Sequence, residues 1–195
     1  MIRFVEEGHR YFDGEREIPC VSRIMQETGV SSPFYQNKEW HARKGTYVHK
    51  AVQLFNAGNL DLATVDETIR PYVEAWKSFL DMERIRIVAS EKIVYHVGLD
   101  YCGRLDMIVE WERMSRVPIV MDLKSGSRSK EHAVQLAAYN LAEFSDSRHG
   151  AVVYLKPTGK FALEILDPMD MDAWTDKWQR IVAEYREKEA RLWVS

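Results

Sequence analysis

The sequence predicts an α/β protein in which a mixed sheet is flanked by helices. Short runs rich in Val, Ile, Leu and Met alternate with longer segments whose apolar residues recur every three or four positions. The chain has 195 residues, of which 46% are hydrophobic and 29% charged, as in an ordinary globular protein. Because no repeat, linker or low-complexity segment divides it, we expect a single domain over residues 1–195.

The N-terminal segment predicts small strands and a short helix. Turn signals at Glu7-Gly8 and Asp13-Gly14 separate short runs of apolar and aromatic residues, which indicates a small N-terminal β hairpin. A helical stretch that ends near Gly29 follows Pro19, and Ser22 is expected to be its N-cap.

Further along the chain, the apolar spacing predicts longer helices and strands. The expected helices are 36–57, ended by Gly58, a helix that begins at Asp66 with Glu67 in its first turn, 130–144, and 168–190. The expected strands are 86–97, 102–111, 117–124, 150–155 and 160–165. The continuously apolar run 150–155 is typical of a central strand.

Strands 102–111 and 117–124 form the stretch on which the functional prediction depends. The polar loop 112–116 between them has hairpin length, and Met114 is the midpoint between Asp106 and Asp122. An antiparallel register therefore places the two aspartates opposite each other or nearly so. The two-residue period puts Asp122 and Lys124 on one face of the second strand.

Two carboxylates that face each other in an apolar sheet are unfavourable unless a cation neutralises them or one is protonated. Oxygen ligands favour a hard divalent ion such as Mg²⁺ or Mn²⁺. Lys124 adds a compact positive charge that can hold an attacking water or stabilise a phosphate transition state. The hairpin alone leaves a second interpretation open, in which Asp122 and Lys124 form a buried ion pair without chemistry.

Four segments, in this order, resemble a known family. Gly103-Arg-Leu-Asp106 and Asp122-Leu-Lys-Ser-Gly126 resemble the PD-(D/E)XK nuclease superfamily. With Gly45-Thr-Tyr-Val-His49 upstream and Gln135-Leu-Ala-Ala-Tyr139 downstream, the set is similar to the RecB-type exonuclease branch, which includes the Cas4-like relatives. The resemblance covers residues 45–139 and implies a restriction-endonuclease-like α/β/α core.

The resemblance implies a role for each matching residue. The expected ligands of Mg²⁺ or Mn²⁺ are His49, Asp106, Asp122 and the carbonyl of Leu123. The expected catalytic set is Asp106, Asp122 and Lys124, with Gln135 and Tyr139 supporting the site or the nucleic acid. Glu91 stays open, because an acid on this strand lies near the metal in several relatives, while a salt-bridged surface residue fits the sequence equally. The histidines without such context are expected to be structural or solvated: His9, His41, His96, His132 and His149.

Nucleic-acid contacts are expected from hydroxyl and basic residues that flank the motifs. The net charge is −3, so basic residues must act locally rather than through the overall charge. In RecB-type relatives a Ser or Thr before the first helix often touches DNA, which is a second interpretation of Ser22. The expected set is Ser22, Arg43, Lys44, Ser125, Arg128 and Lys130.

The activity that the resemblance implies is metal-dependent hydrolysis of phosphodiester bonds in DNA. An exonuclease in recombination, repair or the processing of phage or other mobile DNA is the first interpretation. The alternatives are an endonuclease or junction resolvase with the same site, an inactive module that binds nucleic acid or a protein, and a metal hydrolase with another substrate. A helicase or recombinase is the expected kind of protein partner, and a homo-oligomer is compatible with the sequence.

Cysteine usage and hydropathy exclude several classes of protein. Cys20 and Cys102 are the two cysteines, too few for the four-cysteine iron–sulfur cluster of Cas4-like relatives, and their scarcity suggests a reducing, cytoplasmic location. No apolar run approaches the roughly 20 residues of a membrane helix, and no signal-peptide pattern opens the chain, so we expect no membrane partner.

Overall fold

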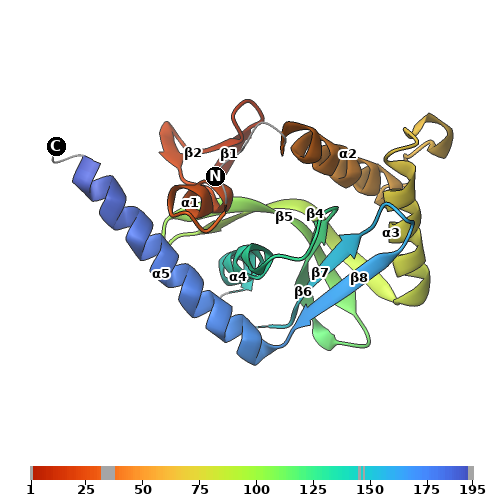
Figure 1. The fold of residues 1–195 in the computed structure, drawn as a ribbon. Helices are drawn as coiled ribbons and strands as arrows, with labels where there is room; N and C mark the ends of the chain where they lie inside the picture. The colour runs from red at the N-terminus through yellow and green to blue at the C-terminus, as the bar shows by residue number, and fades with distance from the viewer. Residues whose placement is uncertain (1, 32–37, 145, 147, 193–195) are drawn as a thin grey trace.

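A five-stranded mixed sheet forms the centre of the protein (Figure 1). The computed structural model describes residues 2–31, 38–144, 146 and 148–192. The strands, in spatial order, are β4 (Ile85–His96), β5 (Tyr101–Trp111), β6 (Ser115–Lys124), β7 (Gly150–Leu155) and β8 (Phe161–Leu166). Neighbours are antiparallel except β6 and β7, which are parallel and are connected through helix α4 (Lys130–Phe144). The predicted mixed sheet is confirmed.

Helices cover both faces of the sheet, which confirms the α/β/α arrangement (Figure 1). One layer consists of α1 (Val21–Glu27), α4 and the long α5 (Pro168–Leu192). The other consists of α2 (Lys38–Asn56) and α3 (Arg70–Met82), with the 3-10 helix η1 (Leu62–Thr64) between them in the chain. Val120 of β6 is buried in the first layer and Met121 in the second, as the two-residue period predicts.

The N-terminal segment forms a small antiparallel sheet of its own, which confirms the predicted N-terminal β structure. Its antiparallel strands are β1 (Ile2–Val5), β2 (Arg10–Asp13) and β3 (Arg16–Ile18). Tyr11 and Ile18 of this sheet are buried against Cys20 and Cys102, and the Cys102 N–H donates a hydrogen bond to the Pro19 carbonyl (3.1 Å). The small sheet is therefore attached to the start of β5.

Two helices begin at residues other than those predicted. Cys20, not Ser22, occupies the N-cap of α1, because its extended backbone pairs with Cys102 and leaves Ser22 in the first helical turn. Helix α3 begins at Arg70 rather than at Asp66, since the Asp66 carboxylate accepts from the Thr68 N–H (2.7 Å) and closes a turn before the helix. The first two positions of the predicted helix 36–57 lie outside the described residues. Among the helices described, none is long and apolar enough to cross a membrane.

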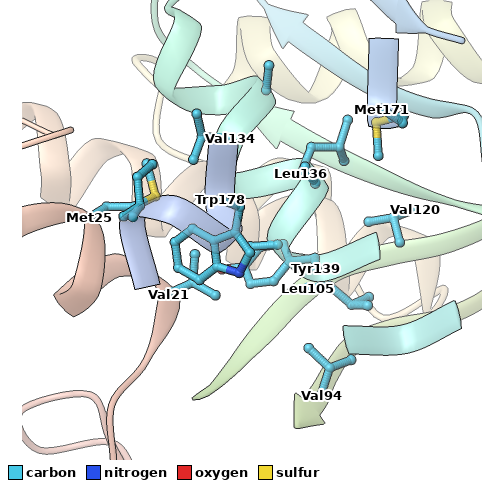
Figure 2. Packing of buried hydrophobic residues seen from close by; sticks show 14 of the residues in the cluster. Val21, Met25, Val94, Leu105, Val120, Val134, Leu136, Tyr139, Met171 and Trp178 are labelled. Carbon is cyan, nitrogen blue, oxygen red and sulfur yellow. The ribbon is translucent and has the colours of Figure 1, made fainter. Parts of the chain in front are cut away.

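The layer formed by α1, α4 and α5 packs tightly around Trp178 and Tyr139 (Figure 2). Tyr139 of α4 lies over β5 at Gly103, where a Cβ atom would come within 2.6 Å of the Tyr139 Cε1 atom. Since real Cβ atoms do not approach a carbon that closely, glycine is required here for packing. The close approach holds α4 against β5, next to the predicted site.

We expect Gly103→Ala to lower the free energy of unfolding by about 1–3 kcal/mol, because the added methyl group must displace the Tyr139 ring. Urea denaturation measures this change. Gly126→Ala is the matched control, since no atom lies within 4 Å of its added Cβ, and it should unfold at an unchanged urea concentration. Equal stability of the Gly103 variant and the wild type would contradict the packing argument.

Candidate active site

Strands β5 and β6 separate at the point where the two predicted aspartates lie. Their pairing follows the predicted register, with Ile108 opposite Val120 and Met107 opposite Met121, and it ends there. Beyond that point β6 continues to pair with β7, where Asp122 lies opposite Val152. The Asp106 carboxylate reaches across the opening, and its Oδ2 accepts a hydrogen bond from the Leu123 N–H (2.7 Å). We call this opening, from Asp106 to Leu123, the strand fork.

Glu91 enters the site because β4 is irregular beside Asp106. The pairing of β4 with β5 passes from Ser90 opposite Met107 to Lys92 opposite Leu105. Glu91 has a positive φ of 51°, a left-handed conformation that costs a non-glycine residue about 1–2 kcal/mol. Its carboxylate pairs with the Arg104 guanidinium (Nε to Oε2, 2.9 Å). Of the two interpretations that the sequence leaves open, the structure supports the one that brings Glu91 to the site.

His49, Glu91 and Asp106 form a compact group of metal-ligating side chains. One potential ligand atom from each lies within 4.8 Å of the other two, and the His49 Nδ1 to Asp106 Oδ1 distance is 3.3 Å. The three residues line a small cavity of about 10 Å³, together with Leu123 and neighbours. An imidazole nitrogen and two carboxylates are donors that Mg²⁺ and Mn²⁺ accept, and a cation would relieve the repulsion between the carboxylates. The residues present therefore fit a divalent ion.

Burial and neighbouring charges shift the protonation of this group. Burial works against the charge of Asp106, but His49, Lys124 and the Leu123 N–H outweigh it and hold the pKa of that carboxyl below its usual range. Burial also opposes the charge of His49, and the Asp106 carboxylate nevertheless raises the pKa of His49. Burial raises the pKa of Asp122 against the effect of Lys124. Because metal ligands must be deprotonated, binding of a cation here would release protons.

Lys124 links the strand fork to α4. Its Nζ lies 2.6 Å from Oδ2 of Asp122, which is 1% exposed, and donates a hydrogen bond to the Gln135 Oε1 (2.8 Å). The Gln135 Nε2 in turn donates to the Tyr139 Oη (3.1 Å), four residues along the same helix. The ion pair that the sequence suggested is present, but Lys124 has a second partner and a fixed position in a chain of polar contacts.

The family model of the PD-(D/E)XK nuclease superfamily matches residues 60–193. The chain belongs to this superfamily. It is therefore a nuclease by family, a hydrolase that acts on nucleic acid, and the predicted superfamily is confirmed. PD-(D/E)XK nucleases generally use divalent metals, and His49, Glu91 and Asp106 form a possible metal-binding site. No curated protein matches the chain.

Solved structures similar to this nuclease include one titled for SSO0001, with 18% identity, a TM-score of 0.32, and coverage of 70% of this chain and 74% of that one. The LHK-Exo complex with dAMP has 11% identity, a TM-score of 0.41, and coverage of 90% and 94%. The alkaline exonuclease LHK-Exo from Laribacter hongkongensis has 9% identity, a TM-score of 0.37, and coverage of 89% and 88%.

A cavity of about 970 Å³ opens in front of the candidate site. Its walls come from the N-terminal sheet, α1, α2, the loop after β6, and α4, and they include His49, Lys124 and Gln135. Of the residues expected to contact nucleic acid, Ser22 and Ser125 line this cavity. Among the described lining residues the other members of the expected set are missing: Arg43, Lys44, Arg128 and Lys130.

Local packing accounts for the position of two of these basic residues. Lys44 donates to the Tyr72 Oη (2.9 Å), so its charge lies between α2 and α3. Arg128 donates to the Leu163 carbonyl and lies over the Tyr154 ring, so its guanidinium is held against β7 and β8. Their contacts with nucleic acid stay predictions, and this arrangement does not support them.

Sequence reasoning missed several residues that line the cavity of this nuclease. His9 and His132 were expected to be structural or solvated, and both line it, as do Arg10 and Arg23. The N-terminal residues carry no signal of this position, because it results from attachment of the small sheet to β5. His132 does carry one, since it lies three residues before Gln135 and therefore on the same face of α4.

Proposed function

We propose that this protein is a divalent-metal-dependent deoxyribonuclease, an exonuclease of the RecB-type branch that works with Mg²⁺ or Mn²⁺ and has no iron–sulfur cluster. One observation carries the proposal: His49, Glu91 and Asp106 line one small cavity, and His49 also lines the larger cavity that contains Lys124. His49, Glu91 and Asp106 lie within 4.8 Å of one another, and Lys124 is held beside them by Asp122 and Gln135. An Asp122–Lys124 ion pair with a purely structural role would not require metal-ligating side chains next to it.

Each residue of the site has its own proposed role in phosphodiester hydrolysis. A divalent ion bound by His49, Glu91 and Asp106 would supply a water of lowered pKa and offset charge on the phosphate. Asp122 and the Leu123 carbonyl are the further ligands that the motif predicts, from the adjoining strand. Lys124 places a positive charge beside the cavity, where it can orient the attacking water or balance the charge of the transition state.

The side-chain contacts of Lys124 support its proposed role. Asp122 and Gln135 restrict its ammonium group from two sides, and Tyr139 restricts Gln135. A charge that is already positioned costs little reorganisation when the reaction occurs. Gln135 and Tyr139 are thus proposed as positioning residues, not as groups that touch the phosphate.

The shape of the cavity supports a strand end as the substrate. Walls from the N-terminal sheet, α1, α2 and α4 surround the approach to the site. Such an enclosure suits a DNA terminus better than the middle of a closed duplex. His49 and three of these walls, the N-terminal sheet, α1 and α2, lie outside the region that the family model matches. We therefore propose that residues 1–195 act together as one nuclease domain.

Digestion of end-labelled linear DNA and of closed circular DNA, with Mg²⁺, with Mn²⁺ and with chelator, tests this proposal. We expect loss of the linear DNA only, dependent on the metal, because the enclosed site needs a free end. Asp106→Asn should lose this activity, while Asp176→Asn, at an exposed position of α5, should keep it. Nicking of the circle would favour the endonuclease alternative, and no cleavage of any substrate, RNA included, would favour the binding-module alternative.

We expect Lys124→Ala to reduce cleavage at least about 100-fold, because a positioned charge at the reacting phosphate is lost. Binding of Mn²⁺, measured by calorimetry, should persist, since Lys124 is not a ligand. Lys124→Met retains the side-chain volume and serves if the Ala variant is unstable after loss of the Asp122 partner. Lys160→Ala, on the exposed surface, is the control. Cleavage at the wild-type rate by either Lys124 variant would show the assigned role to be wrong.

A further inference from the structure

A chain of three side chains fixes the hydrogen position on His132. The His132 Nδ1 lies 3.1 Å from the Tyr154 Oη, and the Tyr154 hydroxyl donates to the Glu164 Oε2 (2.8 Å). A tyrosine hydroxyl has a single hydrogen, and here it points to Glu164. The contact with His132 therefore requires that Nδ1 carry the hydrogen and donate it to the tyrosine oxygen. In a neutral ring, Nε2 is then a hydrogen-bond acceptor without a proton.

The His132 ring is uncharged at neutral pH. Burial, helped by the Lys124 charge, lowers the pKa of His132 to about 4. Glu131 lies nearby, but its Oε1 is 4.0 Å from Nε2, beyond hydrogen-bond distance, and the burial outweighs its effect. Nε2 consequently offers a lone pair and no positive charge.

Helix α4 places this acceptor beside the proposed catalytic site. His132, Gln135 and Tyr139 are separated by three and four residues, so they lie on one face of the helix. Gln135 holds Lys124, and His132 lies one turn nearer the start of α4. His132, Gln135 and Lys124 line the same 970 Å³ cavity. A strand whose phosphate lies at Lys124 therefore passes within reach of this helix face.

A neutral acceptor at this position favours a hydrogen-bond donor over a phosphate oxygen. Phosphate oxygens of a nucleic acid accept hydrogen bonds, so they gain nothing from an unprotonated nitrogen. In the sugar–phosphate backbone of DNA, the donor groups are the hydroxyls at the two ends of the strand. We propose that the His132 Nε2 accepts a hydrogen bond from the terminal sugar hydroxyl of a DNA strand, with Tyr154 and Glu164 as positioning residues. This inference rests on the proposed exonuclease function and specifies which group at the DNA end the protein recognises.

Substrates that differ only at their ends test the assignment. Linear DNA with a 3′-hydroxyl is compared with the same DNA ending in a 2′,3′-dideoxynucleotide, and a 5′-hydroxyl is compared with a 5′-phosphate. At one of the two ends, loss of the hydroxyl should reduce kcat/KM of the wild type roughly 3- to 10-fold, the effect of one neutral hydrogen bond. His132→Phe should cleave both members of that pair at equal rates. The end that responds identifies which hydroxyl is bound.

Two further variants separate recognition from folding. His132→Gln keeps an acceptor near the position of Nε2 and should retain part of the preference for the hydroxyl end. Tyr154→Phe keeps an aromatic ring at this position but removes the hydroxyl that fixes the His132 tautomer, so the preference for the hydroxyl end should weaken. His149→Phe, at the opposite end of β7 from Tyr154, is the matched control and should keep the full preference.

The outcomes distinguish this inference from the function on which it rests. Cleavage by the wild type without any preference for a hydroxyl end would overturn the inference and leave the nuclease proposal standing. A preference that His132→Phe retains in full would overturn it as well. Failure of the wild type to cleave any of these substrates would overturn both the proposed function and the inference.

Discussion

The hydrogen bond from the Leu123 N–H to the Asp106 carboxylate is the interaction on which the site depends. Pairing between β5 and β6 ends after Met107 and Met121, and each strand continues with its other neighbour. A buried backbone N–H without a partner is costly, and the Asp106 side chain satisfies the one at Leu123 (2.7 Å). The same carboxylate is thereby held at the mouth of the strand fork. The sheet loses regular pairing there and gains a position where charged groups from three strands converge.

Charge compensation at the strand fork explains the remaining polar contacts. Arg104 lies against Glu91, His49 against Asp106, and Lys124 against Asp122, so each of these buried or partly buried acids has a basic neighbour. Buried charges need such partners because water no longer solvates them. The arrangement is nevertheless uneven, since the pKa of Asp106 is lowered while those of Glu91 and Asp122 are raised by burial. A divalent cation would complete the compensation, and this is why the site suits a metal.

Much of this architecture could be predicted because it follows from periodicity and turn length. The midpoint at Met114 predicted the β5–β6 register correctly as far as Met121, and the motifs located Lys124, Gln135 and Tyr139 on neighbouring elements. Pairing partners outside the hairpin were not predictable in the same way. Beyond Met121, β6 stays paired with β7, a strand that follows much later in the chain, while its pairing with β5 has ended. No local pattern contains that information.

The residues that sequence reasoning left open or misplaced share a physical cause. Glu91 adopts a left-handed backbone that no propensity favours, and only the tertiary structure holds it there. Lys44 and Arg128 look like free basic residues in sequence, yet Tyr72 and Leu163 engage them through packing of distant elements. The sequence shows that a residue is basic, whereas the direction of its side chain depends on contacts with residues that are distant in the chain.

The central claim is that the strand fork gathers His49, Glu91 and Asp106 around one divalent ion, and the anomalous scattering of Mn²⁺ in a crystal tests it most directly. We predict one anomalous peak between these three side chains in the wild-type protein. The peak should disappear in Asp106→Asn, whose amide is a weaker ligand than a carboxylate. Mn²⁺ bound elsewhere, with no peak at these three residues, would contradict the account.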